Sequence, residues 1–269
     1  MKSESKIINK KDKQERRFYI PKSIRLLFAG IVSLNLLWWM LAVLFNNKAL
    51  PNPLDVYALF PKTLTQGMMD HSIASLQRIV IGVFIALILG VGGGLLTGLS
   101  KKCNRLLNPL LYLSYPVPKL ALLPVVMILF GIGETTKVLM IVLIIVFQLV
   151  ISIRDAIKNI DKENYYVLST LGTSNFQQIW HVVLPAILPE IFSALRISVG
   201  IATSVLFVTE TFGTDKGLGF FIVDAWMRID YLTMYVGIVM LSIIGSFLFM
   251  LIDIMDDMFC KWSKLRSKG

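Results

Sequence analysis

The sequence predicts an all-α integral membrane protein with six transmembrane helices and both termini in the cytoplasm. Three observations predict it: the composition, the length of the apolar runs and the distribution of basic residues. Of the 269 residues, 55% are hydrophobic and only 16% are charged, whereas soluble domains carry about 25% charged residues. Several apolar runs also reach about 20 residues, the length that an α-helix needs to cross a bilayer.

Six segments are predicted to span the membrane. Three of them contain no charged residue. Of the other three, 106–133 is interrupted by prolines, 138–153 is short, and 191–209 carries one charge, Arg196. Arg196 is expected to reach toward the nearer membrane interface. The six predicted spans cover residues 26–45, 79–99, 106–133, 138–153, 191–209 and 231–252.

Basic residues set the predicted orientation. With an inner N-terminus, 19 of the 27 Lys and Arg residues lie in cytoplasmic segments and five lie outside, as the positive-inside rule requires. We therefore predict a basic cytoplasmic tail at 1–23, a permease domain at 24–258 with a cytoplasmic loop at 155–186, and a second tail at 259–269. No basic face with interleaved aromatic residues follows the N-terminal tail, which argues against a nucleic-acid partner and leaves the lipid bilayer as the partner of these charges.

The second predicted span carries a stripe of small residues at four-residue spacing. In lipid, helices associate by close backbone approach through such residues. The stripe predicts a helix buried in a bundle, with lining of a translocation pathway as the alternative. Its members are Gly82, Ala86, Gly90, Gly94 and Gly98.

The third predicted span is interrupted by Pro116, Pro118 and Pro124, with Lys119 among them. Irregular backbone at membrane depth occurs where it is buried in protein or lines a cavity, and a charge within a span points to function. We expect Pro116, Pro118 and Lys119 to line the translocation pathway. The alternative is a kinked packing helix whose lysine finds a carboxylate or reaches the interface.

The long inner loop between the fourth and fifth spans is predicted to form two short helices, the first ending at Gly172. Ser174 opens the second helix, and Gln177 completes a capping box with it. An apolar face follows at helical spacing, and Pro185 is expected to end the helix. This face either binds a partner or packs on the protein's own inner surface or on lipid headgroups. Its members are Phe176, Ile179, Trp180 and Val183.

No catalytic residue, metal site or cofactor is predicted. His71 and His181 lie far apart, Cys103 and Cys260 have no metal-ligand spacing, and the chain lacks the phosphate-binding pattern of ATPases. A membrane-embedded enzyme would need a cluster of His, Asp or Cys within its spans, and no such cluster is present. A secondary transporter remains the alternative function; it would favour inverted repeats and carboxylates at the midplane.

Short motifs in a fixed order resemble the inner-membrane permeases of bacterial ATP-binding-cassette importers, in the branch that includes nitrate, taurine, alkanesulfonate and bicarbonate permeases and some vitamin-precursor permeases. The resemblance covers roughly residues 50 to 255. The matching pieces are Ser75-Leu76-Gln77-Arg78, 116–124, 130–134, Gly172 with Val182 and Leu184-Pro185, Glu210-Thr211-Phe212-Gly213, Gly217-Leu218-Gly219 and Asp224-Ala225.

The resemblance implies a type I importer permease in the bacterial inner membrane. Two permeases, homodimeric or heterodimeric, would form the pathway, two ATPase subunits would bind ATP and dock on the loop, and an extracytoplasmic binding protein would deliver the solute. Glu210 is added to the expected pathway residues. The family's loop usually begins Glu-Ala-Ala, where this chain has Tyr166-Val167-Leu168. The coupling residues expected from the loop are Gly172, Thr173, Ser174, Phe176, Trp180, Leu184 and Pro185.

Overall fold

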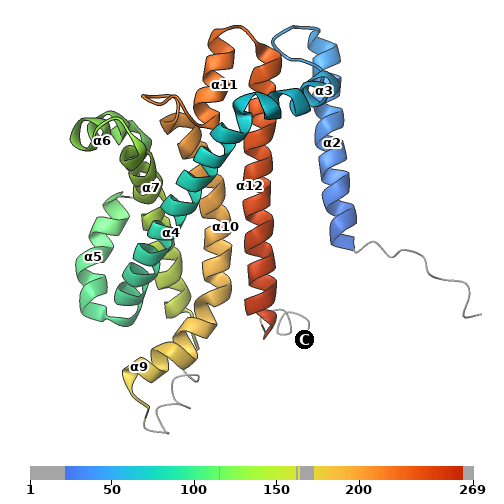
Figure 1. Ribbon diagram of the computed structural model, residues 1–269. Helices are drawn as coiled ribbons and strands as arrows, with labels where there is room; N and C mark the ends of the chain where they lie inside the picture. The colour runs from blue at the N-terminus through green and yellow to red at the C-terminus, as the bar shows by residue number, and fades with distance from the viewer. Residues whose placement is uncertain (1–21, 115, 162, 164–172, 263–269) are drawn as a thin grey trace, which may run out of the picture. The chain divides into compact units, whose positions relative to one another are not determined.

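The computed structural model describes residues 22–114, 116–161, 163 and 173–262, and within these ranges every regular element is a helix (Figure 1). The prediction of an all-α fold is therefore confirmed. The α-helices are α2 (Lys22–Phe45), α3 (Pro53–Thr63), α4 (Met69–Leu99), α5 (Lys101–Ser114), α6 (Leu123–Phe130), α7 (Glu134–Lys158), α9 (Asn175–Gln178), α10 (Leu184–Thr209), α11 (Leu218–Met227) and α12 (Tyr231–Phe259). A kink with non-helical backbone at Gln66 and Gly67 lies within Leu64–Met68, a short π-helical turn lies at Ile179–Val183, and a 3₁₀ turn lies at Lys119–Leu122.

The chain divides into two compact units, Met1–Tyr57 and Ala58–Gly269. In the first unit, the apolar helix α2 is joined to the start of α3 by aromatic and polar contacts. The Tyr57 hydroxyl donates to Asn35 Oδ1 at 2.5 Å, and the Tyr57 ring meets the Trp38 ring edge-on with centroids 6.2 Å apart.

Four helical segments, the first of them kinked at Gln66 and Gly67, are long and apolar enough to cross a membrane. They are Pro53–Leu99, Glu134–Lys158, Phe176–Thr209 and Tyr231–Phe259. A fifth candidate is the broken pair α5 and Lys119–Phe130, which bends by 85°. In α2, the apolar part Ala29–Phe45 is a shorter candidate. The protein is thus a multi-pass membrane protein, while the count of six spans and their orientation stay predictions.

Helices α4 and α7 form the central contact of the second unit and run in the same direction. Gly82, Gly90, Gly94 and Gly98 of α4 lie against Ile141, Leu149, Ile153 and Ile157 of α7, in that order along both helices. Small residues on one helix and branched side chains on the other let the two backbones approach closely.

The parallel course of α4 and α7 has a topological consequence. Two consecutive spans that run the same way need a returning span between them. The predicted six-span topology assigns this return to the broken pair α5–α6, which lies between them in the chain. The prolines at 116 and 118 coincide with this break, as expected for residues that remove backbone donors and bend helices.

The loop helix before α10 begins as predicted but does not end as predicted. The Ser174 amide donates to Gln177 Oε1 at 2.8 Å and the Gln177 amide donates to Ser174 Oγ at 3.4 Å, which confirms the capping box. Pro185 was expected to end this helix, and that prediction is wrong. It lies inside the continuous helical run Phe176–Thr209, directly after a π-turn in which the Leu184 amide donates to the Ile179 carbonyl. The helical run therefore continues through a π-turn into α10.

Cysteine labelling tests the predicted orientation. In a background with Cys103 and Cys260 replaced by serine, Asn175→Cys is expected to resist a membrane-impermeant maleimide in intact cells and to react after permeabilisation. Asp215→Cys, on a predicted outer segment, is expected to react in intact cells. Strong labelling at 175 and none at 215 before permeabilisation would reverse the orientation.

Candidate functional site

A cluster of polar side chains, buried except for that of Glu134, joins the start of α7, the N-terminal half of α4 and the C-terminal end of α10. Ser75 and Arg78 come from α4, Glu134 and Lys137 from α7, and Glu210 caps α10. This set is called the charge cluster below. It contains two cations and two carboxylates, so it is electrically balanced.

Arg78 is the centre of the charge cluster. Its Nε and Nη2 donate to the two carboxylate oxygens of Glu134 at 2.6 and 2.5 Å. Its Nη1 donates to Glu210 Oε1 at 2.5 Å and to the Lys216 carbonyl at 2.8 Å. Arg78 and Lys137 are 4% and 3% exposed, and burying an unpaired charge would cost several kcal/mol. The two glutamates supply the pairing.

Glu210 is fully buried and receives donors from three residues of two helices, α4 and α11. Besides Arg78, the Ser75 hydroxyl lies 2.8 Å from both of its oxygens, and the Gly219 amide donates to Oε2 at 2.8 Å. Ser75 Oγ also accepts from the Leu218 amide at 2.8 Å. The carboxylate therefore fixes the start of α11 against α4.

Two glycines allow this close approach. A Cβ at Gly217, whose φ is +126°, would lie 2.4 Å from Glu210 Cδ and 2.6 Å from Arg78 Nη1. A Cβ at Gly219 would lie 2.5 Å from the Phe207 carbonyl oxygen. Side chains at these positions would separate α11 from the buried Glu210 carboxylate, which explains why positions 217 and 219 are both glycine.

His71 borders the charge cluster one turn before Ser75. Its Nδ1 accepts a hydrogen bond from the Gly217 amide at 3.1 Å, and its ring packs against Phe220 and Phe221. His71 is thus a polar residue at the contact between α4 and α11. Across the described ranges, no group of three His, Cys, Asp or Glu residues could hold a metal ion.

The charge cluster brings together four of the motif pieces read from the sequence, which lie at 75–78, 130–134, 210–213 and 217–219. Sequence reasoning singled out only Glu210 among its charged members and did not recognise Arg78, Glu134 or Lys137 as its neighbours. The position of Arg78 at the edge of an apolar span was a usable signal, because a charge at such a position must find a partner.

The predicted pathway residues occupy different environments. Glu210 was expected on the pathway or against a polar partner; its side chain is 0% exposed, so it lines no open surface in this conformation. Lys119 donates to the Ser114 carbonyl at 2.7 Å and lies 5.1 Å from the centre of the Phe147 ring. Its charge is thus held by a carbonyl at the helix break and by an aromatic face. Pro116 and Pro118 are exposed.

The sequence suggested that Arg196 reaches the membrane interface. In the structure its charge is also paired within the protein. Its guanidinium pairs with Asp253 on α12, with Nε 2.7 Å from Oδ1, and Asp256 lies further away at 3.9 Å. This ion pair joins α10 to α12.

The loop helix presents two aromatic rings on its surface. Phe176 and Trp180 are 72% and 61% exposed, and their rings stack with centroids 6.5 Å apart. Val183, on the same predicted apolar face, is fully buried. Thr173, Ser174, Leu184 and Pro185 flank the pair, whereas Gly172 and 166–168 lie outside the described residues. An exposed, stacked aromatic pair on a capped helix is suited to binding another protein.

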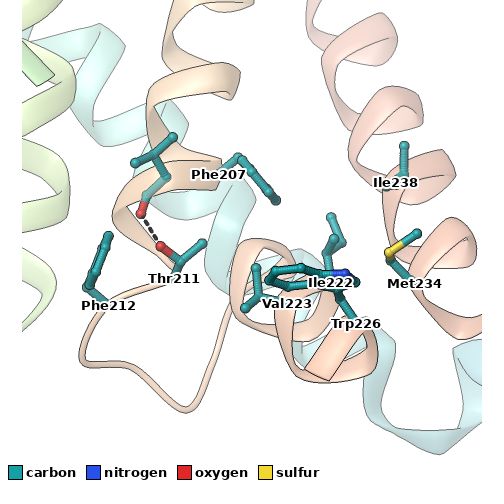
Figure 2. A pocket seen from close by; sticks show the side chains of 9 residues that line it. Phe207, Thr211, Phe212, Ile222, Val223, Trp226, Met234 and Ile238 are labelled. Carbon is teal, nitrogen blue, oxygen red and sulfur yellow. Dashed lines mark hydrogen bonds between the residues drawn. The ribbon is translucent and has the colours of Figure 1, made fainter. Parts of the chain in front are cut away.

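An apolar cavity of about 570 Å³ lies between the end of α10, α11 and the start of α12 (Figure 2). None of its lining side chains is charged, so it favours an apolar occupant. In the close-up, the Thr211 hydroxyl donates to the Val208 carbonyl at 2.7 Å, which satisfies its polar group within α10. The lining residues are Phe207, Val208, Thr211, Phe212, Ile222, Val223, Trp226, Met234 and Ile238.

Known proteins resemble this chain along most of its length. It is 34% identical over 258 residues to the taurine transport system permease protein TauC of Escherichia coli, covering 91% of this chain and 93% of that protein. It is 29% identical over 238 residues to the bicarbonate transport system permease protein CmpB of Synechococcus elongatus, covering 84% and 85%.

Solved structures share the fold. A structure of the MetNI methionine ABC transporter in an inward-facing conformation matches with a TM-score of 0.61 at 16% identity, covering 74% of this chain and 97% of the matched chain. These similarities give no support to the alternative of a secondary transporter. Residues 78–262 match the family of the binding-protein-dependent transport system inner membrane component, and the chain belongs to this family of ABC importer permease subunits.

Proposed function

We propose that two copies of this chain form the translocation pathway of a bacterial inner-membrane importer for a small oxyanion, with a sulfonate such as taurine as the first candidate. The 34% identity to the taurine permease favours this solute, and the bicarbonate permease is a further anion-transporting relative. A separate binding protein would deliver the solute and set most of the specificity. Two separate ATPase subunits would bind ATP, and this chain would need no cofactor of its own.

The exposed pair Phe176 and Trp180 is the observation that carries the coupling to an ATPase. The two rings lie on a capped helix that continues directly into α10. A push on this short helix would therefore be transmitted to a membrane-spanning helix without a flexible hinge between them. Large aromatic side chains at the centre of an interface are frequent anchors of binding energy.

Replacing Phe176 with alanine is expected to weaken ATPase docking by about 2 kcal/mol, a loss of roughly thirtyfold in affinity. Insertion and folding should be unaffected, because the ring is mostly exposed. The readouts are ATPase binding, substrate-stimulated ATP hydrolysis and uptake in proteoliposomes. Tyr112→Ala, which removes a 78% exposed aromatic ring of α5, serves as the matched control and should leave all three unchanged. Wild-type docking and uptake in Phe176→Ala would exclude the pair as the coupling contact.

Reconstitution tests the function as a whole. The chain, its ATPase and its binding protein would be placed in liposomes and supplied with radiolabelled taurine, an alkanesulfonate, nitrate or bicarbonate. We expect ATP-dependent accumulation of at least one oxyanion that requires the binding protein. Accumulation driven by an ion gradient without ATPase would contradict the proposal, and accumulation of an uncharged solute alone would contradict the substrate class.

A further inference from the structure

The two carboxylates of the charge cluster differ sharply in exposure. The Glu210 side chain is 0% exposed, whereas that of Glu134 is 66% exposed. Both cations beneath Glu134 are buried, with side chains 5% exposed for Arg78 and 3% for Lys137. The exposed Glu134 carboxylate would be hydrated on leaving Arg78, whereas the buried cations that it leaves need another counter-charge in its place. Glu134 is therefore the replaceable anion of the cluster.

The charges that remain without Glu134 define what could replace it. Arg78, Lys137 and Glu210 together carry a net charge of one positive unit. A single negative charge at the position of the Glu134 carboxylate would restore neutrality. The charge balance thus favours a solute group with one negative charge, such as a sulfonate, over an uncharged group at this position.

The geometry of Arg78 specifies the shape of that anion. Its Nε and Nη2 form one edge of the guanidinium with two parallel donors, and the two Glu134 oxygens occupy this edge at 2.6 and 2.5 Å. Glu134 Oε1 also lies 3.6 Å from Lys137 Nζ. Carboxylates and sulfonates both present paired oxygens that bind such an edge.

We propose that Arg78 and Lys137 form a binding site for a small organic oxyanion, which the carboxylate of Glu134 occupies when the anion is absent. The proposal rests on the proposed function only in identifying this anion as the transported solute. Arrival of the anion would break the tie between Arg78 and α7, while Arg78 would keep its contacts to Glu210 and the Lys216 carbonyl.

The two cations within the predicted spans, Arg196 and Lys119, are less suited to this role. Arg196 faces two carboxylates, Asp253 and Asp256, so its surroundings carry a net negative charge. Lys119 is a single cation held by a backbone carbonyl and an aromatic ring. In the part of the chain that the structure describes, the charge cluster is the place where two buried cations lie beneath one exposed carboxylate.

Methanesulfonate binding to the purified permease in detergent tests the proposal, with calorimetry at constant ionic strength. The Glu134 carboxylate competes with the added anion for Arg78. Its removal in Glu134→Ala is therefore expected to tighten methanesulfonate binding by about tenfold or more. Adding Lys137→Met to Glu134→Ala should reverse much of this gain. Asp224→Asn is the matched control, because it removes a carboxylate from an ion pair whose cation, Arg228, is 60% exposed; its affinity should equal that of the wild type.

Equal affinity in wild type and Glu134→Ala, or no binding in either, would overturn the site. The reconstituted uptake assay separates this failure from failure of the proposed function. Uptake of a sulfonate without any gain in Glu134→Ala binding would reject the site and keep the function. Tighter binding in Glu134→Ala without uptake of any oxyanion would support the site and reject the substrate class.

Discussion

Replacing Glu210 with alanine is expected to lower the free energy of unfolding by about 3–5 kcal/mol, the cost of breaking a buried ion pair by removing one partner. The change leaves Arg78 beside Glu134 only, and it also deprives Ser75 and the Gly219 amide of their acceptor. The start of α11 should then lose its attachment to α4. Titration with a denaturing detergent, followed by tryptophan fluorescence and helical circular dichroism, measures the loss.

Two further variants separate loss of charge from loss of packing. Asp224→Asn breaks an exposed ion pair and should change stability by less than about 1 kcal/mol. The double variant Arg78→Met with Glu210→Met removes both buried charges and should be less destabilising than the sum of its single variants, because neither charge is left alone. Wild-type stability in Glu210→Ala, or strict additivity in the double variant, would contradict a structural role for this pair.

Four of the six predicted spans coincide with long apolar helices, because each depends on a local property, an apolar run of about 20 residues. The capping box at Ser174 and Gln177 was predictable for the same reason, since its two residues lie three positions apart. The continuation of the helix through Pro185 was not, because a proline that ends one helix and a proline that begins the next look alike in sequence. The π-turn at Ile179–Val183, which joins the two, has no comparable signature.

The charge cluster was harder to predict because its members are separated by up to 135 residues. The sequence indicates that Arg78 and Glu210 lie near the ends of apolar segments, and hence that each needs a partner. It does not indicate which partner, since that depends on the parallel course of α4 and α7. Exposure is a property of the folded arrangement, so the difference between Glu134 and Glu210 could only come from the structure.

Gly90→Leu and Gly94→Leu are expected to prevent assembly of the helix bundle. A Cβ alone at Gly90 would lie 2.5 Å from Leu149 Cβ, and one at Gly94 would lie 2.6 Å from Ile153 Cβ. Both contacts are to atoms close to the backbone of α7, so the two helices would have to separate. Forcing extra methylenes into a packed interface costs about 1–3 kcal/mol or more. Yield and monodispersity after size-exclusion chromatography measure the effect.

Gly92→Leu is the matched control on the same helix, because a Cβ at Gly92 would meet no atom within 4 Å. This variant should express and elute like the wild type. If Gly92→Leu were as damaging as Gly90→Leu, general intolerance of leucine in α4 would explain both results, and the close packing on α7 would not be needed.

Trimming the opposing side chain of α7 distinguishes two kinds of contact with the glycines of α4. At Gly93, a Cβ would lie 2.8 Å from Val150 Cγ2 but 3.8 Å from Val150 Cβ, so Val150→Ala should rescue Gly93→Ala. At Gly90 the obstructing atom is Leu149 Cβ, which alanine retains. Leu149→Ala should therefore leave Gly90→Ala unassembled, and it adds a cavity cost of its own. We expect rescue at position 93 and none at position 90, because the backbone distance between α4 and α7 limits assembly at position 90. Rescue at both positions would contradict this, since side-chain volume alone would then decide whether the two helices pack.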